Sequence, residues 1–306
     1  MIAPQVEPSG ILLINKHAGA TSHDIVYKVR RALHTRRVGH TGTLDPMATG
    51  VLVVLVGRAA KACEYVSHDR KVYKATLRLG LTTDTEDTTG TVLTKSDALP
   101  LPDQVKDVCE RFVGKIKQIP PMYSALKVDG QKLCDLARKG TTVEREAREI
   151  EIFSLSCEPT EIESDYILSV DCSGGTYIRT LCADIGAALG CGGAMATLER
   201  VQTGGFTLDE CITTAELEQL DDEARLARLL PVEVLFSTLP AVHLSDFYKR
   251  LCRNGCEIYQ SKIHTSFAIG TRVRICDAQG HFFALGEVRE YQSGSAIAMI
   301  KLFELE

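Results

Sequence analysis

Residues 39–50, Gly-His-Thr-Gly-Thr-Leu-Asp-Pro-Met-Ala-Thr-Gly, constrain the fold of this chain more than any other stretch. Three glycines and an Asp-Pro step cannot bury apolar surface, so the stretch is predicted to be a loop. The apolar run that follows, 51–55, is typical of a strand. We therefore expect a loop held against a sheet, with one acidic residue, Asp45, displayed on it.

Positive charge gathers just before this loop, in Lys28, Arg30, Arg31, Arg36 and Arg37. A carboxylate beside so many cations suggests chemistry on a polyanion, although an isolated Asp-Pro step commonly serves only to start a turn. Residues 1–150 carry 23 Lys and Arg against 17 Asp and Glu, whereas residues 151–306 carry 12 against 23. This asymmetry fits a protein that meets a polyanion on one face, and it equally fits charges that merely solvate the surface.

Length and composition place the chain among ordinary globular proteins. With 306 residues, 44% of them hydrophobic and 25% charged, it is long enough for two domains. Its eleven cysteines include no Cys-x-x-Cys pair, so we expect reduced, mostly buried thiols rather than a zinc site. Residues 1–10 lack the apolar core of a signal peptide, and no apolar run approaches the length of a membrane-spanning helix. We expect a cytoplasmic protein without membrane attachment.

Hydrophobic periodicity predicts the main elements. Strands are expected at residues 10–14, 71–79 and 166–172, and a Thr- and Asp-rich loop at 80–90. Helices are expected from an N-cap at Ser22 to Leu33, at 103–113, and over 178–189. Pro231 and Pro240 bracket an expected domain boundary, beyond which residues 272–276, 281–288 and 295–303 are predicted to be strands of a small all-β module.

Four stretches, at residues 39–50, 71–80, 120–127 and 172–181, together resemble the TruB family of tRNA pseudouridine synthases. The resemblance covers most of residues 10–235. It implies an α+β catalytic domain there, with a mixed, largely antiparallel central sheet and flanking helices, the pseudouridine synthase fold. Residues 240–306 resemble the family's small C-terminal all-β, PUA-like RNA-binding domain.

The resemblance also implies an activity, the isomerisation of uridine 55 to pseudouridine in the T-arm of tRNA, without cofactor, metal or obligate protein partner. Asp45 matches the catalytic nucleophile, and Arg179 matches the arginine that keeps it ionised. Tyr73 matches an active-site tyrosine whose ring could stack on uracil and whose hydroxyl could transfer a proton. Strand alternation by itself would make Tyr73 a core residue.

Further positions are implied by the resemblance to bind substrate. A uridine in folded RNA must leave its stack, and His40 matches the side chain that fills the gap. Taken without the resemblance, such a histidine is a structural hydrogen-bonding residue. Asp87 matches an acid that can pair with the cleft arginine. The remaining positions are Lys16, Lys61, Lys127, Tyr177 and Leu198, and residues 120–149 correspond to a mobile segment that folds over RNA.

The chain departs from the family pattern in two places. His17 stands where a proline is usual, and 198–200 reads Leu-Glu-Arg instead of Leu-Arg-Arg. Two other functions compete with catalysis of pseudouridine formation. A non-catalytic tRNA-folding chaperone could use the same scaffold, and a phosphate-handling hydrolase could use Asp45 as acceptor. The hydrolase lacks the Lys-Ser/Thr pair expected after a phosphate loop.

Overall fold

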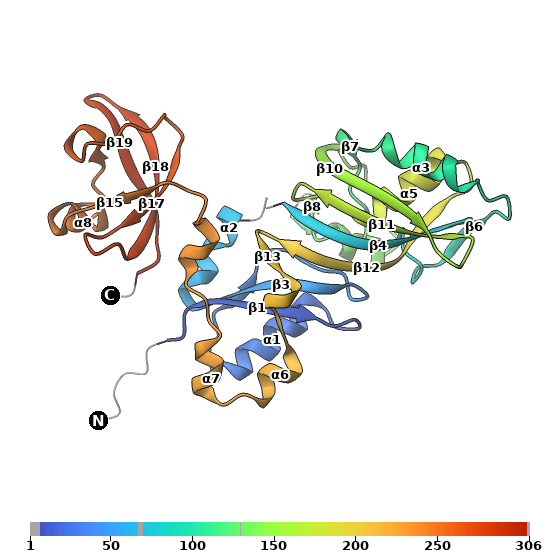
Figure 1. Cartoon of the computed structure of the whole chain (residues 1–306), viewed down its shortest axis with the longest axis horizontal. Helices are drawn as coiled ribbons and strands as arrows, with labels where there is room; N and C mark the ends of the chain where they lie inside the picture. Colours follow the sequence, from blue (N-terminus) through green and yellow to red (C-terminus); the bar gives the residue numbers. More distant parts are fainter. Residues whose placement is uncertain (1–6, 67–69, 129, 305–306) are drawn as a thin grey trace.

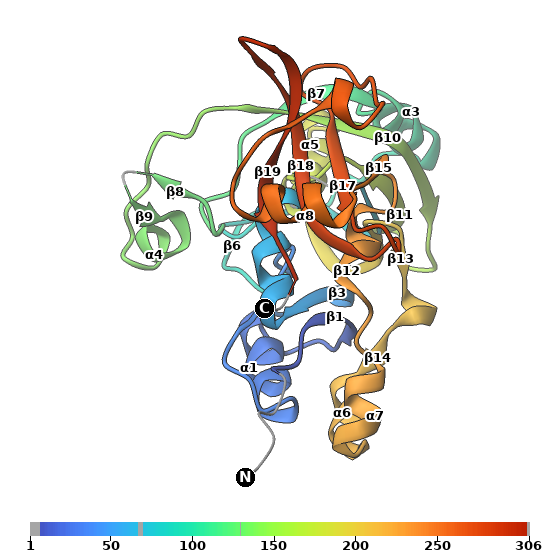
Figure 2. The ribbon, with the colours of Figure 1, turned by 90° about the vertical axis from the view of Figure 1, so that its left-hand side faces the viewer.

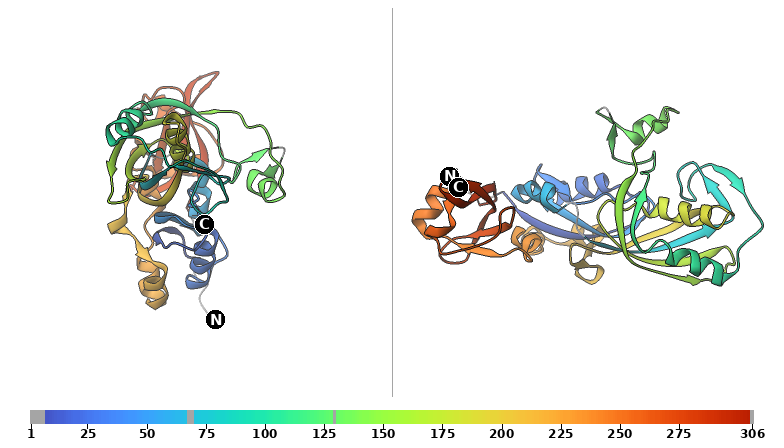
Figure 3. Two further views of the ribbon diagram at one scale, coloured as in Figure 1. Left: turned by 90° about the vertical axis from the view of Figure 1, so that its right-hand side faces the viewer. Right: turned by 90° about the horizontal axis from the view of Figure 1, so that it is seen from above.

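The computed structural model describes residues 7–66, 70–128 and 130–304. A long α+β body carries a smaller all-β domain at one end (Figures 1 and 3). Within the described residues, no helix is both long and apolar enough to span a membrane.

The body is built on one twisted sheet with the order β14–β1–β3–β12–β4–β11–β10–β7, to which β2 adds beside β3 and β13 beside β12. Neighbours run antiparallel except β1 with β14 and β3 with β12. This confirms the expected mixed, largely antiparallel sheet. The strands are β1 (Gly10–Lys16), β2 (Val38–His40), β3 (Thr49–Val56), β4 (Lys71–Leu79), β7 (Gly114–Gln118), β10 (Arg148–Pro159), β11 (Asp165–Cys172), β12 (Gly193–Thr203), β13 (Phe206–Thr207) and β14 (Ile212–Thr213).

Helices flank the sheet in two groups, one at each end of the body (Figure 1). α1 and α6 lie against β1 and β3, while α3 and α5 lie against β4, β10, β11 and β12. The α-helices are α1 (Ser22–Ala32), α2 (Cys63–Val66), α3 (Pro102–Glu110), α4 (Leu133–Arg138), α5 (Ile178–Ala188), α6 (Thr214–Gln219), α7 (Asp222–Ala227) and α8 (Asp246–Arg253). Short 3-10 turns are η1 (Gly57–Ala62), η2 (Leu208–Glu210), η3 (Val232–Phe236) and η4 (Gln260–Lys262).

The apolar run in β3 is uninterrupted because both faces of this strand are buried. Leu52 and Val54 point into the cluster under α1. Val51, Val53 and Leu55 point to the opposite face, where the chain segment leading to the C-terminal domain covers them. A strand buried on both sides needs apolar residues at every position instead of the alternation of a half-exposed strand.

The start of α1 differs from the expectation. Its N-cap is Thr21, not Ser22, because Thr21 and Asp24 form the reciprocal bonds of a capping box. Ser22 is the first helical residue and is buried. The predicted helix at 103–113 ends earlier, at Glu110. The predicted loop at 80–90 contains β5 (Leu81–Thr83), which forms a hairpin with β6 (Val92–Lys95).

A close approach of β3 to the central strand β12 explains the last glycine of the 39–50 stretch. Gly50 has φ +104° and pairs with Arg200 of β12, so an added Cβ would lie 2.2 Å from the Arg200 carbonyl oxygen. A side chain at position 50 is therefore excluded both by backbone conformation and by space.

The C-terminal domain is a five-stranded sheet of order β15–β17–β18–β19–β16 with α8 beside it. This confirms the all-β expectation, with a single helix added at one side. Its own apolar core includes Val273, Ile275 and Phe283. The strands are β15 (Ala241–His243), β16 (Ile258–Tyr259), β17 (Arg272–Cys276), β18 (Phe282–Tyr291) and β19 (Gly294–Leu302).

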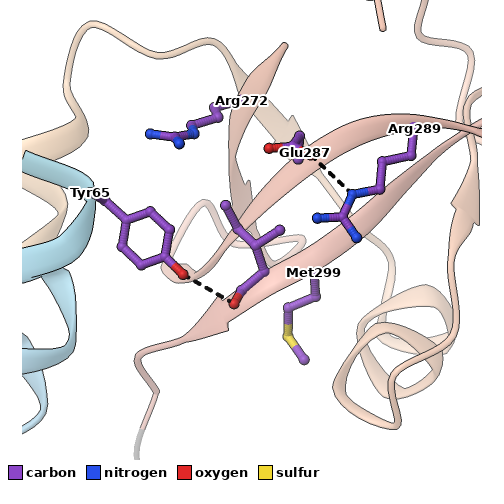
Figure 4. Close-up of a pocket in the computed structure, with 6 residues that line it drawn as sticks. Tyr65, Arg272, Glu287, Arg289 and Met299 are labelled. Atoms are coloured by element: carbon purple, nitrogen blue, oxygen red, sulfur yellow. Dashed lines mark hydrogen bonds and ion pairs between the residues drawn. The ribbon is translucent and has the colours of Figure 1, made fainter. Parts of the chain in front are cut away.

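The two domains meet where η1 and α2 contact β19. Tyr65 Oη donates to the Ile300 carbonyl at 3.4 Å, across a pocket of about 380 Å³. Figure 4 shows this pocket, which is lined by Tyr65, Arg272, Glu287, Arg289, Met299 and Ile300. Lys301 of β19 forms an ion pair with Glu64. Beside these polar contacts, a buried apolar cluster of Ala62, Val66, Phe236, Leu285 and Phe303 joins the two domains.

One segment projects from the body. Figures 2 and 3 show the hairpin of β8 (Lys127–Val128) and β9 (Gln131–Lys132), followed by α4, standing away from the central sheet. Arg145 closes the base of this projection by donating to the Pro120 carbonyl at 3.0 Å. The projection falls within the 120–149 segment expected to fold over RNA.

Candidate active site

The loop that carries Asp45 joins β2 to β3 and is fastened to α1 through one side chain. Ser22 Oγ accepts from the Leu44 amide at 2.9 Å and donates to the Leu44 carbonyl at 3.2 Å. Both hydrogen bonds are buried. The residue immediately before Asp45 is therefore fixed to a helix.

Lys16 fastens the same loop from the end of β1. The side chain is fully buried, and its ammonium donates to the carbonyl oxygens of Ala48 at 2.5 Å and Pro46 at 3.2 Å. Burial lowers the pKa of Lys16 to about 8, while the nearby charge of Asp45 acts in the opposite direction. With its ammonium bonded to loop carbonyls, Lys16 holds the loop in position.

Arg179 binds the carboxylate of Asp45 through two of its guanidinium nitrogen atoms. Its Nε lies 2.9 Å from Asp45 Oδ2, and its Nη2 donates to Asp45 Oδ1 at 3.1 Å. The guanidinium also donates to the carbonyls of Tyr123 at 2.7 Å and Thr85 at 3.1 Å. The Arg179 side chain is 6% exposed and that of Asp45 30%. The carboxylate is thus the accessible end of an otherwise buried pair.

Opposing effects set the protonation of Asp45. Burial is the largest and raises the pKa of its carboxyl group, and the charge of Asp87 acts in the same direction. Arg179 opposes them by both charge and hydrogen bonding, and Lys16 adds a weaker effect in the same direction. The net pKa lies above its ordinary value. Arg179 therefore limits how far burial can neutralise this carboxylate.

Tyr73 lies on β4 directly opposite Arg200 of β12, with both side chains on one face of the sheet. Both are buried, at 7% and 1% exposure. Burial raises the pKa of Tyr73, and Arg200 opposes this effect. The Arg200 guanidinium donates to the carbonyls of Val51 at 2.8 Å and Gly42 at 3.1 Å. It therefore braces the Asp45 loop from the sheet side.

His40 ends β2 at the start of the loop. Its ring meets His23 of α1 edge to face, with centroids 5.9 Å apart and planes at 83°. Burial, followed by the charges of His23 and Arg200, lowers the pKa of His40 to about 4, so the ring is neutral at pH 7. Its buried Nδ1 atom has no hydrogen-bond partner among the described residues.

The other expected positions divide into two groups, of which the first adjoins the pair of Asp45 and Arg179. Tyr177 is the N-cap of α5, and both of its backbone polar groups bond to the Gln118 side chain, at 2.8 and 3.0 Å. Leu198 on β12 belongs to the same apolar cluster as Tyr73. The charges of Arg179 and Asp45 act on the hydroxyl of Tyr177, which lies near the pair.

The second group lies elsewhere or forms other bonds. Asp87 accepts hydrogen bonds from Thr85 at 2.9 Å and from both the amide and the hydroxyl of Thr89, and its carboxylate forms no ion pair with Arg179 among the described residues. Lys61 donates to the Leu302 carbonyl at the domain junction, at 3.3 Å. The side chain of Lys127 lies outside the described part of the chain.

Two residues of the site were missed in the sequence. Arg200 lay within the departure from the family pattern at 198–200, and an arginine in a segment of small and apolar residues was the available signal. Ser22 was assigned to a cap, and no local signal marks its contact with Leu44. Across residues 7–66, 70–128 and 130–304, no three His, Cys, Asp or Glu side chains are placed to hold a metal ion.

Two family comparisons match this chain. The N-terminal domain of TruB family pseudouridylate synthases matches residues 30–178, and the C-terminal domain of tRNA pseudouridylate synthase B matches residues 179–237. The first match ends, and the second begins, beside Arg179. Together they contain Asp45, Tyr73 and Arg200.

Curated relatives are similar over nearly the whole chain. A tRNA pseudouridine synthase B from Clostridium kluyveri is 43% identical over 296 residues, covering 96% of this chain and 99% of that protein. One from Geobacter sulfurreducens is 44% identical over 273 residues, covering 87% and 89%. Among solved structures, a chain of a Cbf5-Nop10-Gar1 complex superposes with a TM-score of 0.74 at 25% identity, covering 96% of this chain and 85% of that one.

Proposed function

The chain belongs to the TruB family of tRNA pseudouridine synthases, isomerases that act on tRNA, and we propose that it converts uridine 55 of the T-arm to pseudouridine with Asp45 as nucleophile. The observation that carries this proposal is the pairing of Asp45 with Arg179. A single, partly exposed carboxylate is held by a buried arginine that is itself fixed by two backbone carbonyls. Such an arrangement supplies an oriented, partly exposed anion.

The reaction breaks the bond between ribose C1′ and uracil N1 and forms one between C1′ and C5. The C5 proton leaves and N1 gains a proton, so the product is an isomer and no redox partner is consumed. Asp45 forms the bond to the substrate and is released unchanged at the end. Because Arg179 opposes the effect of burial on the pKa of Asp45, the carboxylate can act as a nucleophile near neutral pH.

Tyr73 stacks on the uracil ring in this proposal. It lies on β4, in the cluster that includes Leu198, and the charge of Asp45 acts on the pKa of its hydroxyl. Because burial raises that pKa, the hydroxyl is neutral at pH 7. We assign Tyr73 stacking and hydrogen-bond donation, and we assign Arg200 the positioning of both Tyr73 and the loop.

The target uridine must be flipped out of its stack before it can reach Asp45. His40 supports this step because its ring is neutral at pH 7 and lies where β2 enters the loop. We propose that its ring fills the gap left in the RNA. The 120–149 segment, which projects from the body (Figure 2), would close over the T-arm from the other side.

We also propose that the C-terminal domain contacts the tRNA. The protein is further proposed to act in the cytoplasm without an obligate protein partner. Lys61 lies at the junction of the two domains, beside β19, where it could meet RNA that spans both. All eleven cysteines are free thiols, which fits a reducing compartment.

A tritium-release assay tests the function. tRNA transcript labelled at uracil C5 is incubated with the wild-type protein and with Asp45→Asn, an isosteric change that removes the charge. A second transcript carries cytidine at position 55. We expect release only by the wild type and only from the first transcript. Release by Asp45→Asn would exclude Asp45 as nucleophile, and release from the second transcript would move the target away from position 55. Binding of tRNA without release would favour the chaperone function.

A further inference from the structure

Two cysteines far apart in the sequence face each other across the interface of α3 and β10, which lie side by side in Figures 1 and 2. Cys109 lies near the end of α3 on its buried face, with Val105 and Val108. Cys157 lies on β10 and packs against the apolar cluster that contains Cys109. Both line one surface pocket of about 320 Å³.

A β-bulge places Cys157 on this face. Before the bulge, Ile150 and Ile152 are the inward residues of β10. The pairing with β11 shifts register between Ile152 and Ser154, and from there Leu155 and Cys157 turn inward instead. An extra residue in one strand reverses the alternation of its side chains, so an unbulged strand would point Cys157 away from α3.

The two thiols differ in protonation and access. Interaction with the Cys109 thiol lowers the pKa of Cys157 despite burial and the nearby charge of Glu158. The pKa of Cys109 is raised by the same contact and by burial. Cys157 is half-buried at the pocket, whereas Cys109 is only 2% exposed. Cys157 therefore has the properties of an attacking thiolate and Cys109 those of a sheltered second thiol.

We propose that Cys109 and Cys157 form a reversible oxidation site at which hydrogen peroxide closes a disulfide between α3 and β10. The elements involved lie away from Asp45, so this site does not depend on the RNA chemistry proposed above. The oxidant enters through the pocket that both cysteines line, not through the candidate active site.

The chemistry balances in two steps. The Cys157 thiolate attacks one peroxide oxygen, an S–O bond forms, the O–O bond breaks, and the departing hydroxide takes up a proton to become water. The Cys109 sulfur then attacks the Cys157 sulfenic acid, an S–S bond forms, the S–O bond breaks, and the oxygen leaves as water with the Cys109 proton. Two thiols and one peroxide give one disulfide and two waters, and a dithiol reductant reverses the change.

Cys182 is the competing partner. It lies on α5 in the same cluster, is fully buried, and interacts electrostatically with Cys109 and Cys157. It does not line the pocket. The proposal therefore requires that Cys182→Ser leave the disulfide intact.

Peptide mapping tests the site on the full chain. Reduced protein is treated with hydrogen peroxide, its remaining thiols are alkylated, and it is cleaved after glutamate without reduction. This cleavage isolates Cys109 in residues 87–110 and Cys157 in residues 152–161, because the bond between Glu158 and Pro159 resists cleavage. We expect these peptides joined, two of the eleven thiols lost, and both thiols recovered after dithiothreitol.

Three variants complete the test. Cys157→Ser should lose the joined peptide, whereas Cys256→Ser, which alters an exposed cysteine outside the pocket, should retain it. Cys109→Ala should leave a sulfenic acid on Cys157 that dimedone traps, so this variant reports even if Cys157→Ser folds poorly. The proposal is overturned if the wild-type protein yields no joined peptide or if Cys157 pairs with Cys182 instead. It is also overturned if dimedone labels another cysteine in place of Cys157 in Cys109→Ala.

Discussion

Ser22 holds both backbone polar groups of Leu44, the residue immediately before Asp45. One hydroxyl thereby couples the first turn of α1 to the position of the proposed nucleophile. The loop has little apolar surface of its own, so such bonds from neighbouring elements fix its conformation. Lys16 and Arg200 act on the same loop from β1 and β12.

Ser22→Ala leaves the Leu44 amide and carbonyl buried without their partner. We expect unfolding free energy to fall by about 1–3 kcal/mol, because buried polar groups lose their hydrogen bonds. Turnover should fall as Asp45 loses its fixed position, with KM for tRNA little changed. Urea unfolding and single-turnover kinetics measure these effects. The control is Ser245→Ala, at an exposed helix cap without a side-chain bond, and equal losses in both variants would contradict the coupling.

Arg179→Ala removes the group that most strongly opposes the rise in the Asp45 pKa. The pKa of Asp45 should then rise further, so a higher pH is needed to ionise the carboxylate. The acid limb of the pH profile of kcat/KM should move to higher pH, and the maximum rate should fall because orientation is also lost. An acid limb that stays in place would show that Asp45 does not titrate in that limb.

Lys16 makes stability depend on pH in alkali. Its folded pKa is about 8 against an ordinary 10.5, so between these values the unfolded chain binds more protons and stability rises with pH. The gain is at most about 3 kcal/mol. Over the same range the neutral amine holds the loop carbonyls less firmly, and turnover should fall. Unfolding free energies measured at pH 7 and pH 10 test this rise in stability. The Lys16→Met variant should lack the contribution of Lys16 to the difference between the two values.

Arg200→Met removes the fork that bonds the carbonyls of Val51 and Gly42. We expect a loss of about 1–3 kcal/mol in unfolding free energy, together with reduced turnover. Arg200→Lys should recover little of either, because an ammonium cannot reproduce the planar fork. Arg36→Met, at an exposed arginine, is the control for loss of charge alone. Wild-type turnover in Arg200→Met would contradict the role of Arg200 in positioning the loop and Tyr73.

The sequence predicted those elements whose side-chain pattern depends on one buried face. The strand at 71–79 alternates, and the helix after Gly175 repeats its apolar residues at helical spacing, so both were found with bounds correct to about a residue. β10 and β12 were not predicted. β10 is a charged strand next to the sheet edge with a bulge, and β12 begins with Gly-Ala-Met-Ala, a stretch of small residues without alternation.

The small residues of β12 make sense only in three dimensions. An added Cβ on Gly186 of α5 would lie 2.1 Å from the backbone nitrogen of Gly193, so the helix rests directly on this strand. Such a contact favours glycine at both positions and erases the apolar pattern by which a strand is found. The central strand of the site was therefore the hardest to predict.

By itself, the sequence indicated the all-β C-terminal domain through its strand patterns. Through contiguous motifs that resemble the TruB family, it also indicated the fold class and the candidate residues Asp45, Tyr73 and Arg179. Only the tertiary structure decided that Lys16 is buried beneath the loop, that Asp87 bonds Thr85 and Thr89, and that Ser22 and Arg200 hold the loop in place. The physical reason is that a side chain's hydrogen-bond partners and exposure depend on elements distant in the chain. Residue type and spacing do not encode which of these elements will meet.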